Sequence, residues 1–213
     1  MPATRRADEL RPRKQPVQAR SRDTVQVILR AAAQVFASTG YAASTNHIAE
    51  RAGVSIGSLY EYFPNKDALL VALMEAHIQE GGAILTQAAL AVSTARPDVR
   101  AVVRLFAHAM VTLHARERAL HRVLFEETPL PRRVRRQLAD LERQVISSVE
   151  GFLRAHPEVT KRDPSLAAGV IVHAVEGVTH KLVVHGERDV DVEPYVEEIV
   201  ALVSAYLAAD TSR

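Results

Sequence analysis

The sequence of 213 residues contains no cysteine and no tryptophan, and only 5 % of its residues are aromatic. Without cysteine, disulfide bonds, thiolate zinc sites and cysteine nucleophiles are excluded, and we expect a cytoplasmic location. The 33 alanines and 20 leucines, against only 9 glycines, favour helix over sheet, although the 27 valines do not. Hydrophobic residues make up 47 % of the chain, enough for the core of one or two small domains.

Long apolar runs are also missing from the sequence. The longest run within a helical pattern spans about seven residues, 166–172, whereas a membrane-spanning helix needs about 20. The first residues, MPATRRADELRPRKQPVQARSR, are basic and lack the apolar segment of a secretory signal. We therefore expect no membrane partner and a flexible basic arm over residues 1–21.

Charge is distributed unevenly along the chain. Residues 1–66 hold 10 Lys and Arg against 5 Asp and Glu, whereas residues 67–213 hold 17 against 20. This asymmetry indicates that the first third meets a polyanion, unless it arose by chance. The arm could follow DNA phosphates or enter the minor groove, or it could be a tail that binds nothing. Its basic residues are Arg5, Arg6, Arg11, Arg13, Lys14 and Arg20.

Apolar residues recur at three- and four-residue spacing along most of the chain, which predicts an all-α fold of about nine helices. Ser21 is the expected N-cap of the first helix and Gly40 its end, and Gly81-Gly82 could interrupt the long helix. The expected helices span 22–39, 45–52, a short segment after Ser55, a long segment from Asn65, 97–115, 117–127, 131–155, 163–185 and 192–209.

Residues 45–63, TNHIAERAGVSIGSLYEYF, carry the most informative pattern. A helix-turn-helix needs apolar residues inside both helices, a small residue where they touch, and glycine in a turn of positive φ. These requirements are met at the right spacing by Ile48, Ala49, Gly53, Val54 and Leu59. The pattern predicts a DNA-binding unit whose second helix follows Gly53.

The second helix of this motif would expose small and hydroxyl-bearing residues to DNA. Glycine and serine let a backbone approach closely, hydroxyls bond phosphates, and Ile56 could contact a thymine methyl group. Lys66 and Thr45, each at the start of a helix, would add to backbone donors aimed at a phosphate. The DNA-binding residues predicted in this way are Thr45, Ser55, Ile56, Gly57, Ser58, Tyr60, Tyr62 and Lys66.

From about Asp23 to Leu70 the sequence resembles the TetR family of one-component repressors. The resemblance is carried by Thr45, Ile48-Ala49, Ala52-Gly53-Val54-Ser55, Gly57-Ser58-Leu59-Tyr60, Tyr62-Phe63 and Asn65-Lys66-Asp67. It implies DNA-contact roles for Thr45, Ser55, Gly57, Tyr60, Tyr62 and Lys66, and more variable, sequence-reading positions at Ile56 and Ser58.

The resemblance implies three parts: the arm over 1–21, a helix-turn-helix domain over 22–66, and an effector-binding and dimerisation domain over 67–213. It also implies a homodimer formed through the last two helices, about 163–185 and 192–209. The first of these is apolar nearly all round, as an interface helix must be. We expect a non-enzymatic regulator without a cofactor, most simply a repressor released from double-stranded operator DNA by an unknown small-molecule effector.

Four candidate effector-binding residues fall on helices that line the effector cavity in TetR-like proteins, although such residues could equally be plain core: Phe106, Met110, His114 and Phe125. His173 is a further candidate effector contact. His173, Glu176 and His180 share a helix face and could bind a metal, but a dimer seam or pocket wall explains them better. The basic run at Arg132, Arg133, Arg135 and Arg136 is interpreted as a solvated helix face.

Two other function classes stay open. A constitutive, architectural DNA-binding protein would share the motif but need no effector. A metal enzyme built on a helical bundle would need a catalytic constellation, and we find no phosphate-binding glycine loop, nucleophile elbow or His-Glu-x-x-His motif.

Overall fold

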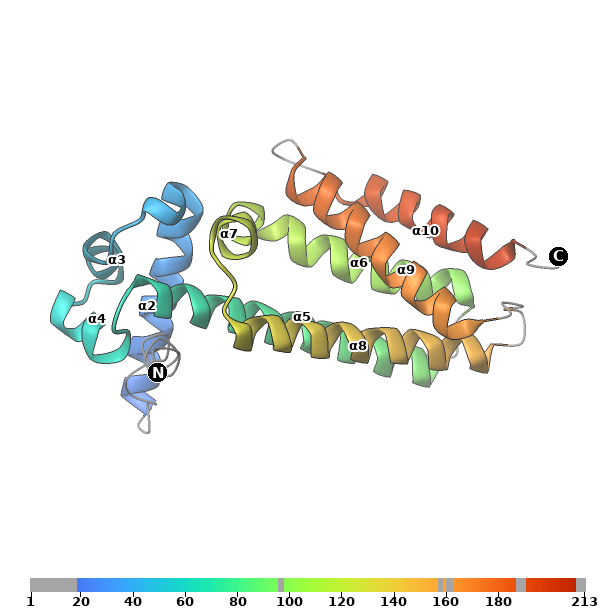
Figure 1. Cartoon of the computed structure of the whole chain (residues 1–213), viewed down its shortest axis with the longest axis horizontal. Helices are drawn as coiled ribbons and strands as arrows, with labels where there is room; N and C mark the ends of the chain where they lie inside the picture. The colour runs from blue at the N-terminus through green and yellow to red at the C-terminus, as the bar shows by residue number, and fades with distance from the viewer. Residues whose placement is uncertain (1–18, 96–97, 157–158, 160–162, 187–190, 210–213) are drawn as a thin grey trace. The chain divides into compact units, whose positions relative to one another are not determined.

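The computed structural model describes residues 19–95, 98–156, 159, 163–186 and 191–209. Within these residues the chain forms nine α-helices, one 3-10 turn and two π-helical turns, with no strand (Figure 1). The predicted all-α class is confirmed. The α-helices are α2 (Ala19–Thr39), α3 (Thr45–Ala52), α4 (Ile56–Tyr62), α5 (Lys66–Ala95), α6 (Val99–Arg116), α7 (Arg118–Arg122), α8 (Arg132–Ala155), α9 (Pro164–Val178) and α10 (Glu193–Ala208).

Contacts divide the chain into two compact units. The N-terminal unit comprises the described residues up to His77 together with Ala119–Arg135. The C-terminal unit comprises Ile78–Arg118 and the described residues from Arg136 onward. The functional division expected at residue 66 stays a prediction.

In the N-terminal unit, α2 packs against α3, and α3 against α4. Phe36, Ile48 and Leu59 are completely buried among them. Within the described residues α2 starts at Ala19, so Ser21 lies inside the helix and the prediction that it forms the N-cap is wrong. Gly40, with φ of 69°, ends the helix as expected and starts the 3-10 turn η1 (Gly40–Ala42).

Helix α5 runs without a break through Gly81-Gly82, although the sequence analysis allowed for an interruption at these residues. A Cβ atom on Gly81 would lie 3.3 Å from Leu113 Cδ2, so the missing side chain lets α6 pack closely against α5. Over Lys66–Val92, α5 also has the length and composition of a membrane span, with a mean hydropathy of 1.3. Its apolar residues Leu69, Leu70 and Met74 are fully buried, as in the core helix of a globular domain.

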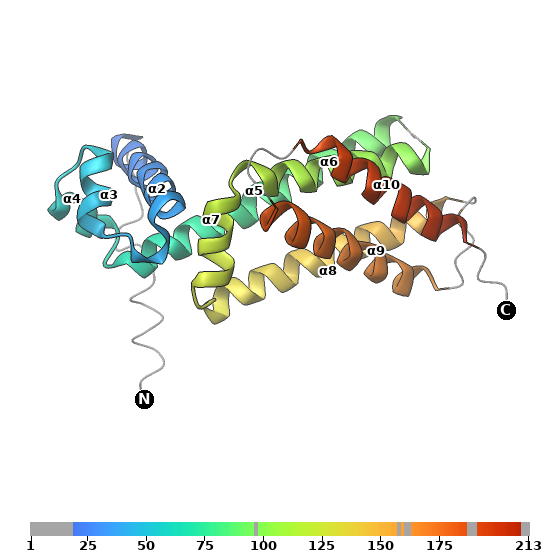
Figure 2. The same ribbon diagram turned by 90° about the horizontal axis from the view of Figure 1, so that it is seen from above.

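The C-terminal unit is built around α6 and α10, which pack along one another (Figure 2). Arg104 of α6 pairs with Glu193 and Glu197 of α10 at the edge of this contact. The helix predicted to start at Pro97 begins at Val99 with Asp98 as its N-cap, and Pro97 itself lies outside the described residues. The buried core comprises Ala107, Val111, Leu153, Ala167, Ala168, Val196, Ile199, Val200, Val203 and Leu207.

Two predicted helices differ from expectation in the same way. The segment predicted over 117–127 forms α7 followed by the π-helical turn η2 (Val123–Glu127), and the segment over 163–185 forms α9 followed by η3 (Thr179–Val184). At the end of η2 the Thr128 hydroxyl donates to the Val123 carbonyl oxygen at 2.6 Å. A π turn adds a residue to the helical repeat and so rotates the following side chains to another face.

Replacing Gly53 by alanine should lower the free energy of unfolding by about 1 kcal/mol. Gly53 has φ of 67°, which an L-residue adopts only at a cost, although its Cβ position is open. Gly151 in α8 is equally uncrowded but has no positive φ. Gly151→Ala is therefore the matched control and should raise stability by roughly 0.5 to 1 kcal/mol. Urea unfolding followed by circular dichroism measures both; equal effects of one sign would contradict the turn argument.

Candidate nucleic-acid interface

The two helices of the motif are defined by short side-chain caps. Ser44 caps α3 by accepting a hydrogen bond from the His47 amide, and Ser55 caps α4 by accepting one from the Ser58 amide at 3.0 Å. Gly53 ends α3 in the left-handed conformation, as the sequence predicted. The helix-turn-helix expected over residues 45–63 is therefore present, with helix starts fixed by serine.

The residues predicted to pack inside the motif form its inner face. Ile48, Ala49 and Leu59 are at most 3 % exposed, whereas Val54 is half-buried. Because this packing fixes how α4 is rotated on α3, it also determines which α4 residues point outward.

The outer face of α4 presents a mixture of apolar, small and hydroxyl-bearing side chains. Ile56 and Tyr60 are 37 % and 39 % exposed, and Ser55 and Gly57 are exposed as well. Ser58 and Tyr62 were expected to be exposed but are half-buried. A Cβ atom added at Gly57 would meet nothing nearer than Ser55 Oγ at 3.8 Å, so this part of α4 is open to a close approach.

A hydrogen bond joins the beginning of α3 to α4 on this face. Thr45 Oγ1 and the Tyr60 hydroxyl lie 2.9 Å apart, and either atom can donate. Two residues predicted separately to contact DNA are thereby held together. A hydroxyl pair of this kind can donate to one phosphate oxygen while keeping its internal bond.

Lys66, the first residue of α5, is held by a neighbour that sequence reasoning missed. Its Nζ donates to the Tyr41 carbonyl oxygen at 2.6 Å and lies 3.9 Å from the centre of the Tyr41 ring. The Tyr41 hydroxyl donates to Asp67 at 3.0 Å, and this bond raises the pKa of Tyr41, keeping the hydroxyl protonated. Only the aromatic residue directly after Gly40 could have signalled this cluster in the sequence.

The turn η1, which contains Tyr41, is hydrogen-bonded to the η2 segment of the N-terminal unit. The Tyr41 amide donates to Glu127 Oε2 at 3.3 Å, across 86 residues of sequence. A Cβ atom on Gly40 would lie 3.2 Å from the same carboxylate oxygen. Glu127 thus connects the residues beside Lys66 to the segment that follows α7.

Comparison with known families supports the sequence-based resemblance. The chain matches the family described as "Tetracyclin repressor-like, C-terminal domain" over residues 98–207, more than half of its length. It also matches "Bacterial regulatory proteins, tetR family" over residues 28–73. The chain belongs to the TetR family. TetR-family regulators are DNA-binding transcription factors, and membership implies a transcription factor rather than an enzyme.

Curated relatives share only part of this TetR-family chain. It is 42 % identical over 67 residues to the uncharacterized HTH-type transcriptional regulator YvkB of Bacillus subtilis, covering 31 % of the chain and 35 % of that protein. It is 38 % identical over 80 residues to the HTH-type transcriptional activator FasR of Mycolicibacterium smegmatis, covering 37 % and 36 %. The matches thus span about a third of each relative.

Solved structures share the whole TetR-family fold. A putative TetR-family regulator from Mesorhizobium loti superposes with a TM-score of 0.73 at 21 % identity, over 90 % of this chain and 98 % of that one. The regulator FadR from Bacillus subtilis, solved in complex with stearoyl-CoA, gives 0.66 at 20 % identity, over 87 % and 100 %. At these identities the likeness shows the fold alone.

The predicted effector-binding residues of this TetR-family chain do not form one described cavity. Phe106, Met110 and His114 lie on α6, and His114 is buried with its Nδ1 2.8 Å from the Met110 carbonyl oxygen. Phe125 lies on η2 in the N-terminal unit. Cavities of about 90 and 270 Å³ in the C-terminal unit are lined by other residues.

The polar residues of α9 are not gathered into a metal site within the described part of the chain. His173 is exposed, with ring nitrogens 3.4 Å from Glu142 and 3.5 Å from Glu176. The ring of His180, in η3, instead lies 5.0 Å from that of His114.

The arginine run at the start of α8 is exposed at Arg132, Arg133, Arg135 and Arg136, in agreement with a solvated helix face. Arg133 pairs with Glu75 of α5.

Proposed function

We propose that this protein is a ligand-responsive transcriptional regulator that binds a palindromic operator as a homodimer. In its simplest form it is a repressor that a small-molecule effector releases from DNA. The observation that carries the proposal is the outer face of α4, where exposed Ile56, open Gly57 and the Thr45–Tyr60 hydroxyl pair lie together.

Contacts on this face fit the grooves and phosphates of duplex DNA. Ile56 can contact a thymine methyl group, whereas the hydroxyls and the first amides of α3, α4 and α5 suit phosphate oxygens. Lys66 supplies the positive charge at the start of α5, where Asn65 Oδ1 accepts a hydrogen bond from the Ala68 amide at 2.8 Å. Arg51 Nε donates to Gln34 Oε1 at 2.8 Å. Because Glu50 and Glu61 balance the charges of Arg51 and Lys66, residues 45–66 carry little net positive charge.

A two-fold dimer would place two α4 helices in successive major grooves, roughly 34–36 Å apart. The C-terminal unit has an unpartnered apolar surface suited to such pairing. Leu166 and Val170 of α9 are 65 % and 43 % exposed, and Leu202 of α10 is 49 % exposed. Val170 and Leu202 line a shallow groove of about 90 Å³ that side chains of a second copy could fill.

Fewer observations support the proposed binding of an effector. The Bacillus subtilis FadR structure, of the same fold, was solved with stearoyl-CoA, so the fold accommodates an acyl-CoA ligand there. We propose Phe106, Met110, His114, Phe125 and His173 as effector contacts and cytoplasm as the location. FasR of Mycolicibacterium smegmatis is named as an activator, so an effector that recruits the protein to DNA is the alternative direction.

A constitutive DNA-binding role is the second candidate. It is favoured by the two described cavities, since neither includes any proposed effector contact and both fall below the usual size of a ligand pocket, roughly 300–1,000 Å³. A thermal-shift screen of small molecules, with and without operator DNA, separates the two roles. A compound that stabilises the free protein and lowers operator affinity supports the sensor.

Operator binding should depend steeply on salt. If the dimer neutralises six or more phosphates, its affinity should fall by roughly 10³ or more between about 50 and 200 mM salt. The test is a gel shift with DNA flanking the protein's own gene, repeated over that range. A shift of the DNA band that requires this fragment and weakens with salt supports the function. No shift at low salt, or a shift that does not change with salt, contradicts it.

A further inference from the structure

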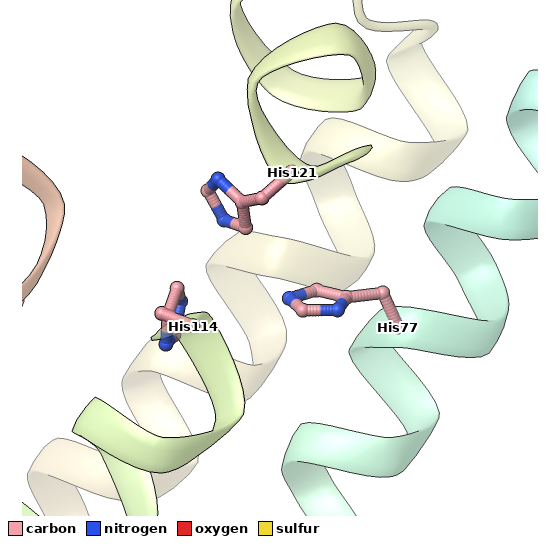
Figure 3. A group of neighbouring side chains, drawn as sticks. All are labelled: His77, His114 and His121. Carbon is pink, nitrogen blue, oxygen red and sulfur yellow. The ribbon is translucent and has the colours of Figure 1, made fainter. Parts of the chain in front are cut away.

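Two histidines from different helices face one another inside the N-terminal unit. His77 lies on α5 and His121 on α7, and their ring centroids are 5.3 Å apart with the planes inclined by 71°. Their ring nitrogens approach within 4.8 Å. Figure 3 shows the two side chains extending from their helices into the same space; His114, also labelled there, belongs to the C-terminal unit.

The pair is largely shielded from solvent. His121 is only 4 % exposed and His77 is half-buried. The ring of Phe125 on η2 lies 4.8 Å from that of His121 and 5.5 Å from that of His77. An apolar wall beside the two imidazoles strengthens their interaction with a cation, because less water competes for it.

We propose that His77 and His121 form a binding site for a divalent transition-metal ion of the zinc, nickel or copper class. Imidazole nitrogen is a preferred ligand of these ions. Two nitrogens bound to one tetrahedral zinc lie roughly 3.4 Å apart, so a small rotation of the half-buried His77 side chain brings the pair into range. Water or donor atoms of another ligand complete the coordination.

This site goes beyond the proposed function, because none of the predicted DNA contacts includes either histidine. A bound ion would link α5, which begins at Lys66, to α7, which leads through Phe125 to Glu127 and its bond to Tyr41. The residues that this link involves, from Lys66 to His77 and from His121 to Glu127, all belong to the N-terminal unit. An ion that binds only the folded pair also stabilises the folded state.

The experiment is a titration of tag-free, chelator-treated full chain with Zn²⁺, followed by calorimetry and by thermal unfolding. One tight ion per chain and a raised melting temperature are expected for the wild type. His77→Gln and His121→Gln should each weaken that binding by more than about tenfold and remove the thermal shift. Exposed His108 of α6 provides the matched control, and His108→Gln should bind as the wild type does.

Folding and metal binding can be separated in this design. If buried His121 cannot be replaced without loss of helical circular dichroism, half-buried His77 carries the test alone. The proposal is overturned if folded His77→Gln binds zinc as tightly as the wild type does. It is also overturned if the wild type has no tight zinc site. If EDTA reverses the Zn²⁺-induced rise in melting temperature in the wild type alone, that result supports the proposal.

Discussion

Replacing Gly57 by glutamate is expected to lower operator affinity by more than about 100-fold, because a like charge at an interface costs several kcal/mol. Gly57 lies in the first turn of α4 on its exposed face, where a new side chain would meet DNA phosphates directly. The fold should persist, since the nearest atom to a Cβ at this position is 3.8 Å away. A carboxylate in the first turn also interacts favourably with the helix dipole.

Gly151→Glu is the matched control for this variant. Gly151 is an exposed helical glycine of α8 with nothing within 4 Å of its Cβ position, and it lies outside the motif. Both variants gain the same charge, so fluorescence anisotropy with operator DNA isolates the effect of position. Wild-type affinity in Gly57→Glu, or an equal loss in Gly151→Glu, would remove the α4 face from the DNA interface.

Leu202→Glu is expected to convert the dimer into a monomer and lower operator affinity by more than about 100-fold. Leu202 of α10 is 49 % exposed and borders the groove that also contains Val170 and Tyr206. A carboxylate buried there in a second copy would be unpaired, which is strongly unfavourable. Loss of the dimer makes each half-site bind a separate molecule, so the gain from two linked recognition helices disappears.

Sedimentation measures this prediction directly. At micromolar concentration the wild type should sediment as a dimer of 23.4 kDa chains and Leu202→Glu at the mass of one chain. Leu90→Glu is the control, because Leu90 of α5 is 62 % exposed but does not line the groove. A dimeric Leu202→Glu, or a Leu90→Glu that dissociates equally, would place the interface elsewhere.

Local sequence signals predicted the motif well because they act over a few residues. A serine cap at Ser55, a glycine of positive φ at Gly53 and apolar spacing from Ile48 to Leu59 each determine geometry within one or two turns. The same signals gave most helix bounds. Ser21 misled the prediction because a serine within a helix can resemble a cap when no breaker precedes it.

Features that depend on distant residues were not predictable from the sequence. The π-helical turns η2 and η3 follow ordinary helical patterns, and their extra residue reflects packing rather than local propensity. Tyr41 meets Lys66 and Glu127 only in the fold, over 25 and 86 residues. The histidine pair joins residues 44 positions apart, so neither His77 nor His121 has a metal-binding motif nearby.

Hydrogen bonds at the starts of α3 and α5 hold several of the proposed DNA-binding groups in place. Lys66 is held over Tyr41, and Tyr41 is hydrogen-bonded to Asp67 and Glu127, so the charge beside the motif has a fixed position. The Thr45–Tyr60 pair fixes two hydroxyls in the same manner. Donors held in place before binding lose little side-chain entropy when DNA arrives.

Selection of binding sites by the wild type from a pool of random duplex DNA shows directly whether it reads DNA as a two-fold dimer through α4. Such a dimer should enrich a palindrome whose half-site centres lie about one helical turn, or a multiple of it, apart, bound by an even number of chains. Gly57→Glu should enrich nothing from the same pool. Enrichment of no sequence by the folded wild type, or of a single asymmetric site bound by one chain, would contradict a two-fold regulator reading DNA through α4.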